Sequence, residues 1–170
     1  MEFTHIEDTF INIGGQFYTS AFNIQEKLQN IKAYLFDWDG VFNDGRKGDD
    51  HVSDFSEIDS VGVNMLLFGH FLTFKHQAKI ALISHENDPI CHSWASREGL
   101  DEVYLKATQK EKALAHFCDV HDLTPDNVVY VYDDVSDVPV AAQVGLRMVV
   151  GRQSNPVFQN TLSAINWWTF

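Results

Sequence analysis

The sequence predicts an α/β protein built on a doubly wound parallel sheet. Short apolar segments typical of strands alternate along the chain with longer segments that have a helical pattern. Three of the strand-like segments, at 33–36, 80–83 and 128–132, are continuously apolar, as expected for strands covered on both faces. The 170 residues, 45% of them apolar, suffice for one domain with a sizeable core. In such a sheet, ligands bind beyond the carboxyl ends of the strands.

The first elements set the domain boundaries. Residues 1–22 show no clear period, and we expect them to form an amino-terminal extension to a domain of residues 23–170. Asn23–Asn30 predicts a short helix that leads into a buried strand at Ala33–Phe36. Residues 45–58 are polar around a Gly-Asp-Asp centre, which indicates a hairpin or projecting loop.

The remaining elements follow in alternation. Val61–Lys75 has an apolar helical pattern, and its segment Met65–Phe74 is expected to be a buried helix, not a membrane span. A strand is predicted at Ile80–Ile83, and the next helix should begin at Asp88–Pro89 and end at Gly99. Further on we expect strands at Glu102–Tyr104, Val128–Tyr132 and Arg147–Val150, helices at Lys110–His121, Asp137–Val144 and Asn155–Ile165, and a turn at Thr124–Asp126.

Composition excludes several classes of partner. The formal net charge of −12 argues against nucleic acid or an anionic membrane, because both need a basic surface. Two cysteines, Cys91 and Cys118, favour a reducing compartment. The first residues lack the pattern of a signal peptide, and no apolar run is long enough to span a bilayer. We therefore expect a cytoplasmic protein.

Two carboxylates end the first strand. Asp37 and Asp39 are two positions apart and would share a face of a regular strand, and Gly40 follows them. Like charges held so close repel, more strongly when buried. A cation can neutralise them, a proton can be shared, or the strand can end there. A hard cation such as Mg²⁺ would make one carboxylate a usable nucleophile near a bound phosphate.

Other reactive side chains follow the neighbouring strands. Ser84 comes after the second strand, and Lys110 begins the helix after the third. Asp133 and Asp134 end the fourth strand, with Asp137 three residues later. The carboxyl ends of parallel strands meet at one edge of a sheet, so we expect these side chains to gather there.

The order of these residues resembles the haloacid dehalogenase (HAD) superfamily of phosphotransferases. DWDGVFNDG at 37–45 is similar to its first motif, DxDGxxxDG, and YDDVSD at 132–137 to its fourth, GDDxxD. Ser84 and Lys110 stand where its second and third motifs have a hydroxyl residue and a lysine. The DGR at 44–46 and DEVYLKATQKEKALAHF at 101–117 resemble the capless subgroup typified by 3-deoxy-D-manno-octulosonate 8-phosphate phosphatase. The resemblance covers residues 24–151.

The resemblance implies a Rossmann-like (HAD-like) fold with a small β-hairpin insert, residues 45–58, in place of a cap domain. It implies Mg²⁺-dependent hydrolysis of a small phosphorylated metabolite through an aspartyl-phosphate on Asp37. Asp39 would act as acid and base. Mg²⁺ would be held by Asp37, the backbone carbonyl of Asp39 and Asp133.

The same resemblance assigns supporting roles. Asp134 and Asp137 would orient the metal ligands, and Ser84 and Lys110 would bind the phosphoryl oxygens. Lys106 and Lys112 remain alternatives to Lys110; its spacing from the preceding strand and from Asp133 matches the family without gaps. The capless relatives form tetramers, which implies a homotetramer here.

Departures from the family pattern fall at positions that select the substrate. Tyr132 replaces the fourth-motif glycine, His85-Glu86 replaces Gly-Arg, Ile58 replaces an arginine, and the carboxyl-terminal glycine-rich tail is absent. An alternative function is therefore a catalytically weak binding or regulatory protein on the HAD fold. A response-regulator receiver is disfavoured, because its phosphorylated aspartate follows the third strand, where this chain has Tyr104-Leu105. A zinc site at His85, Cys91 and His92 is also disfavoured, because no second Cys/His pair has ligand spacing.

Overall fold

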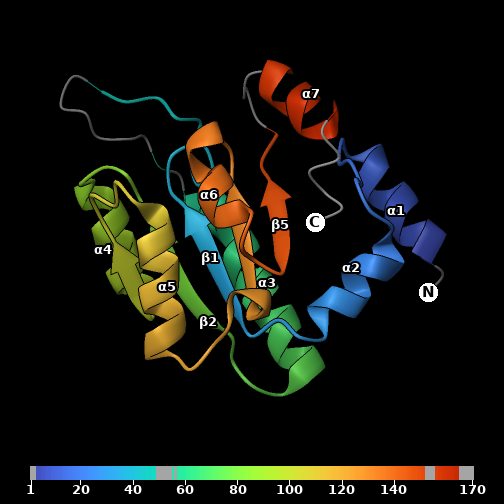
Figure 1. Cartoon of the computed structure of the whole chain (residues 1–170), viewed down its shortest axis with the longest axis horizontal. Helices are drawn as coiled ribbons and strands as arrows, with labels where there is room; N and C mark the ends of the chain where they lie inside the picture. The colour runs from blue at the N-terminus through green and yellow to red at the C-terminus, as the bar shows by residue number, and fades with distance from the viewer. Residues whose placement is uncertain (1–2, 49–54, 56, 152–155, 165–170) are drawn as a thin grey trace.

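A five-stranded parallel sheet forms the centre of the protein. The computed structural model describes residues 3–48, 55, 57–151 and 156–164. The strands lie side by side in the order β3-β2-β1-β4-β5, and every pair is parallel (Figure 1). Their bounds are β1 Ala33–Asp37, β2 Lys79–Ile83, β3 Glu102–Tyr104, β4 Val128–Tyr132 and β5 Leu146–Val149. This order confirms the predicted doubly wound α/β fold.

Helices cover both faces of the sheet. They are α1 Phe3–Asn12, α2 Ala21–Leu28, α3 Glu57–Phe74, α4 Pro89–Glu98, α5 Lys110–Val120, α6 Val138–Ala141 and α7 Pro156–Ala164, with short 3₁₀ turns η1 Pro125–Asn127 and η2 Val135–Asp137. Side chains of α2, α3 and α4 pack on one face, and those of α5, α6 and α7 on the other. The result is a three-layer α/β/α arrangement.

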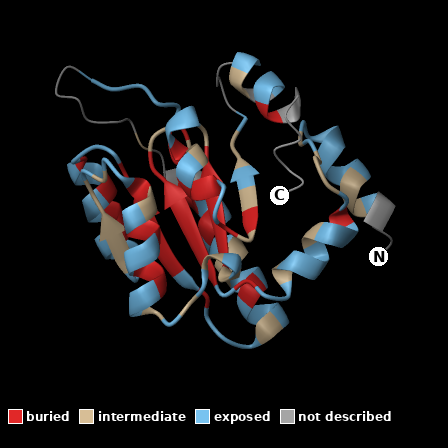
Figure 2. Cartoon of the chain, viewed as in Figure 1, coloured by how far each residue is buried: buried red, intermediate tan, exposed pale blue. Residues whose placement is uncertain are grey.

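The alternation of side chains along β1 fills both layers of the core. Tyr34 and Phe36 pack toward α3 and α4, while Ala33 and Leu35 pack toward α5 and α6. All are buried, and the buried residues concentrate on the central strands (Figure 2). A strand buried on both faces needs the continuous apolar run that the sequence has.

Helix α4 begins and ends at the residues that the sequence predicted, and its capping residues explain why. The Asp88 carboxylate accepts hydrogen bonds from the backbone N–H groups of Ile90 (2.7 Å) and Cys91 (3.3 Å). Pro89 occupies the first helical position, and Gly99 ends the helix with a left-handed φ of 69°.

The prediction that Met65–Phe74 is a buried helix is wrong. Helix α3 includes this segment, but Met65, Phe68 and Leu72 are among its exposed residues. The segment is apolar around its whole circumference, so composition does not reveal that only one side of it meets the sheet. No helix in the described ranges is long and apolar enough to cross a membrane.

Two predicted segments have mixed outcomes. The hairpin at 45–58 lies largely outside the described residues, which include only 45–48, 55 and 57–58 of it. The expectation that the segment 1–22 has no clear period is wrong for α1, because Phe3, Ile6 and Phe10 recur there at helical spacing. Helix α2 packs beside β5, so this amino-terminal part lies at one edge of the sheet (Figure 1).

Candidate active site

The carboxyl end of β1 carries the first carboxylate of the site. Asp37 is the last residue of the strand, is buried, and lies opposite Ile83 of β2. The chain then turns at Gly40, whose φ of +79° favours glycine. A side-chain carbon at this position would also overlap the carboxylate of Asp133, so the turn has to pass directly against that residue. Because the strand ends at Asp37, Asp39 does not share its face.

A buried lysine joins two of the carboxylates. Lys110, the first residue of α5, donates from Nζ to Oδ1 of Asp37 (2.8 Å) and to Oδ1 of Asp137 (2.6 Å). All three side chains are buried. One cation therefore faces two carboxylates in an environment that screens charge poorly, which makes both ion pairs strong but leaves a net negative charge.

The surplus of negative charge is visible in the pKa values. Burial and the neighbouring Asp137 raise the pKa of Asp37 to about 8, although Lys110 opposes the rise. Burial, Asp137 and Asp134 raise the pKa of Asp133 to about 6. Burial would lower the pKa of Lys110, but Asp37 and Asp137 outweigh this effect and raise it. The site thus favours binding a proton or a cation.

A tyrosine that the sequence analysis did not single out completes the buried network. The Tyr130 hydroxyl donates to Oδ1 of Asp137 at 2.5 Å. Burial, together with Asp137, raises the pKa of Tyr130 well above its usual value, so the phenol stays protonated. Tyr132 stacks on the Tyr130 ring with centroids 5.6 Å apart. The period-two alternation of β4 placed both tyrosines on one face, and this signal could have found them.

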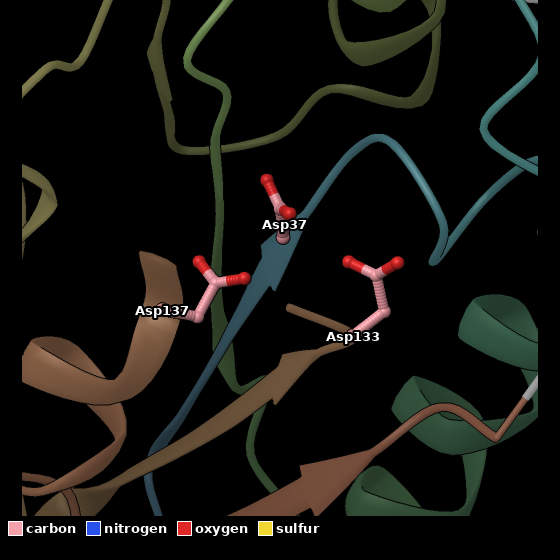
Figure 3. Close-up of side chains that lie close together, drawn as sticks. All are labelled: Asp37, Asp133 and Asp137. Carbon is pink, nitrogen blue, oxygen red and sulfur yellow. The ribbon is translucent and has the colours of Figure 1, made fainter. Parts of the chain in front are cut away.

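Three carboxylates offer a site for a cation. Oxygens of Asp37, Asp133 and Asp137 lie within 4.8 Å of one another around the end of β1 (Figure 3). The second oxygen of Asp137 is buried and has no hydrogen-bond partner in the described part of the chain. Hard oxygen donors are the ligands that Mg²⁺ prefers, so this donor set fits the expected ion. The geometry brings Asp137 into this cluster beside Asp37 and Asp133.

The second acid of the first motif has a different partner. Oδ2 of Asp39 lies 2.9 Å from Nζ of Lys47, and both side chains are partly exposed. The sequence analysis did not identify Lys47, because it lies in the polar insert, where a lysine carries no distinctive pattern. Asp39 is thus on the solvent side of the site, whereas Asp37 is on the buried side.

The other predicted site residues lie nearby with local partners. Ser84 is buried directly after β2, next to the residue opposite Asp37, and its Oγ accepts a hydrogen bond from the Glu86 N–H at 3.1 Å. Asp134 is exposed and caps η2 by accepting from the Val135 N–H at 2.5 Å. Lys110, Asp37, Asp133 and Asp137 are therefore brought together, while Asp134 bonds to its own turn.

A separate cavity of about 590 Å³ lies between α1, α2 and β5. Its lining is mostly apolar, including Phe10, Phe17 and Met148, and contains none of the clustered carboxylates. Its titratable side chains in the described part of the chain are Lys27, Arg147 and Tyr18, with no carboxylate, histidine or cysteine among the lining residues, so we assign the reactive site to the carboxylates and not to this cavity.

Known proteins share both the sequence and the fold. The chain is 27% identical over 131 residues to the 3-deoxy-D-manno-octulosonate 8-phosphate phosphatase of Haemophilus influenzae, covering 75% of this chain and 69% of that protein. It spans about two thirds of the length of the curated relatives it matches. No protein-family profile matches the chain.

Solved structures extend the likeness to the fold. The phosphatase of the same description from Yersinia pestis superposes with a TM-score of 0.68 at 24% identity, over 84% of this chain and 75% of that one. The Moraxella catarrhalis phosphatase, solved with a magnesium ion, a phosphate ion and a KDO molecule, superposes with a TM-score of 0.62 at 19% identity, over 74% of this chain and 70% of that one. A putative HAD superfamily (subfamily IIIA) hydrolase from Legionella pneumophila superposes with a TM-score of 0.63 at 20% identity, over 88% of this chain and 96% of that one. The chain is therefore a distant homologue of the HAD-type 3-deoxy-D-manno-octulosonate 8-phosphate phosphatases, similar to them in both sequence and fold.

Proposed function

We propose that the protein is a Mg²⁺-dependent phosphatase that hydrolyses a small phosphorylated metabolite through an aspartyl-phosphate on Asp37. The single observation that carries this proposal is the buried pair of Asp37 and Lys110, 2.8 Å apart, beside two further carboxylates. A buried carboxylate with a fixed cation beside it suits nucleophilic attack on phosphorus, where negative charge must be neutralised as the bond forms.

Asp37, Asp133 and Asp137 would hold the metal ion, with the backbone carbonyl of Asp39 as a further ligand by resemblance. Bound Mg²⁺ would neutralise charge on the phosphoryl group and on the carboxylates. Lys110 would favour the ionised form of Asp37 and orient it, and Tyr130 would fix Asp137 through its hydroxyl. Ser84 would bind a phosphoryl oxygen by resemblance; its burial beside the strand end is consistent with that role.

Asp39 would serve as the general acid and base. In the first step it would protonate the leaving alkoxide, and in the second it would take a proton from the water that attacks the phosphorylated Asp37. Its place on the solvent side supports this role, because the leaving group and the water must reach it from outside. The ion pair with Lys47 would hold the carboxylate toward that side until substrate enters.

The names of the relatives support a substrate class to test first. Their names give 3-deoxy-D-manno-octulosonate 8-phosphate, a sugar-acid phosphate, and one relative was solved with magnesium, phosphate and that sugar. A sugar-acid phosphate is the first substrate to test, but His85, Glu86 and Ile58 differ from the family pattern and favour a different sugar portion. A homotetramer, as the resemblance implies, belongs to the same proposal.

A panel of phosphate esters with Mg²⁺ tests the proposal. We expect phosphate release from at least one sugar or sugar-acid phosphate, dependent on Mg²⁺ and lost in Asp37→Asn. Asp119→Asn is the matched control, since Asp119 is an exposed carboxylate near the end of α5 opposite Lys110, and it should retain most of the activity. Metal-loaded protein that hydrolyses no member of a broad panel would contradict the proposal.

The departures at Tyr132 and His85 support one second candidate, a binding protein that retains the scaffold without turnover. This protein would bind Mg²⁺ with BeF₃⁻, a mimic of the aspartyl-phosphate, but release no phosphate from any ester. Calorimetric titration with Mg²⁺ and BeF₃⁻ beside the ester panel separates the two candidates.

A further inference from the structure

Helix α3 presents a row of exposed apolar side chains to solvent. The row comprises Ile58, Val61, Met65, Phe68 and Leu72, with Phe71 beside it; their exposed fractions range from 45 to 81%. The five residues of the row are separated by steps of three, four, three and four residues. This 3.5-residue repeat is typical of the seam along which two helices pair. We call this row the α3 seam.

Two glycines flank the α3 seam. Gly62 and Gly69 are seven residues apart, and each follows a seam residue directly. Glycine weakens a helix relative to alanine. A side-chain carbon at either position would have no neighbour within 4 Å, so packing in the described part of the chain does not require glycine there. Small residues beside a seam let the backbone of a second helix come close.

The charge distribution favours a second copy of this chain as the partner. The protein carries a net charge of −12, so two copies repel over most orientations. From Ser60 to Phe74, α3 has no Asp, Glu, Lys or Arg. The only titratable residue there, His70, is buried, and burial lowers its pKa, which keeps it neutral. Two copies can meet at this face without opposing carboxylates.

The exposed area is sufficient for a specific contact. At roughly 150–250 Å² for a large side chain, the exposed fractions of the six residues amount to on the order of 600 Å² per copy. Pairing would bury about 1,200 Å² in total, the lower bound for specific protein–protein interfaces. This area predicts a dimer whose formation depends on protein concentration.

We propose that α3 is a contact surface between two copies of this chain, in which the two seams pair across a two-fold axis, either as a separate dimer or as one pair within a tetramer. A two-fold interface is self-complementary, so the centre of the seam meets its own copy. Met65 is that centre, seven residues from each end of the row. Gly62 and Gly69 lie beside the seam, one before and one after Met65 in the chain, and leave room for the side chains of the second helix. The inference rests on α3 alone and not on the proposed reaction.

Sedimentation velocity of the full chain, from about 1 to 100 μM, tests the proposal. Phe68→Glu should raise the dissociation constant at least tenfold, because pairing would then bury an unpaired carboxylate of each copy against apolar side chains. Val120→Glu, on the opposite layer of the protein, is the matched control and should leave the constant unchanged. Circular dichroism establishes that each variant is folded. A tetramer that falls to dimers in Phe68→Glu also supports the proposal.

Gly69→Leu separates association from folding. Leucine strengthens the helix and finds open space, so the variant should fold at least as well as the wild type, yet the larger side chain should raise the dissociation constant at least tenfold.

A Met65→Cys variant treated with a short bis-maleimide should give a covalent dimer, whereas Val120→Cys should not. The native Cys91 and Cys118 are buried and provide the unreactive background. A wild-type protein that stays monomeric at 100 μM, or an oligomer that neither Phe68→Glu nor Gly69→Leu weakens, would overturn the proposal.

Discussion

The raised pKa of Asp37 makes the metal-free protein sensitive to pH in a predictable direction. In the unfolded chain this carboxyl has a pKa near 3.8, and in the fold burial raises it to about 8. Between these values the folded protein holds a proton that the unfolded chain has lost, so the free energy of unfolding falls as pH rises. The stabilisation of the fold by the protonated Asp37 is fully present below about pH 4 and is lost progressively as the pH rises to about 8.

The magnitude follows from the same shift. The rise of the pKa from 3.8 to about 8 means that ionising Asp37 in the folded protein costs on the order of 5 kcal/mol more than in the unfolded chain. That is a large part of the 5–15 kcal/mol typical of a whole domain. Asp37→Asn cannot ionise and avoids the cost. Between pH 5 and 8, the wild type should therefore lose about 4 kcal/mol more than Asp37→Asn.

Urea unfolding in EDTA at pH 5, 6, 7 and 8 measures this difference. Asp119→Asn, which alters an exposed carboxylate near the end of α5 opposite Lys110, should follow the slope of the wild type. Adding Mg²⁺ should stabilise the wild type more at pH 8 than at pH 6, because the ion competes with the protons on Asp37 and Asp133. Equal slopes for the wild type and Asp37→Asn would refute the reasoning.

Three further predictions concern the same site. Gly40→Ala places a side chain at a positive φ and against Asp133, so it should destabilise the protein by about 2 kcal/mol or more and weaken Mg²⁺ binding. Gly45→Ala has a similar φ but open space around it, so it should destabilise the protein less. Thermal unfolding measures the stability of both variants, and calorimetry measures their Mg²⁺ binding. Lys110→Met should cost about 3–5 kcal/mol and abolish phosphate release, whereas the exposed neighbour variant Lys112→Met should change neither. Tyr130→Phe should lower the free energy of unfolding in urea by about 1–3 kcal/mol, because it removes the hydroxyl that donates a hydrogen bond to Asp137. An unchanged stability would argue against that bond.

The sequence predicted the parts of the fold that local physics decides. Continuous apolar runs identified β1, β2 and β4, the predicted bounds of β1 to β5 agree with the structure within one residue, and Asp88, Pro89 and Gly99 predicted the bounds of α4 correctly. The exposed side of α3 could not be predicted, because its apolar residues surround the helix and only tertiary packing decides which side meets the sheet.

The site could be predicted in part. The alternation of strands and helices indicated that Asp37, Lys110 and Asp133 would gather at one edge, and the structure brings them there. The contact of Tyr130 with Asp137 and that of Lys47 with Asp39 depend on how loops and side chains pack in space, and no sequence spacing specifies them.

Hydrolysis of p-nitrophenyl phosphate tests the central claim most directly. With Mg²⁺, the wild-type protein should release p-nitrophenol, and this rate should fall by about 10³-fold or more in Asp37→Asn and to background in EDTA. Hydrolysis that persists in folded Asp37→Asn, or that does not need a divalent cation, would contradict the assignment of Asp37 as a nucleophile in a metal-dependent site.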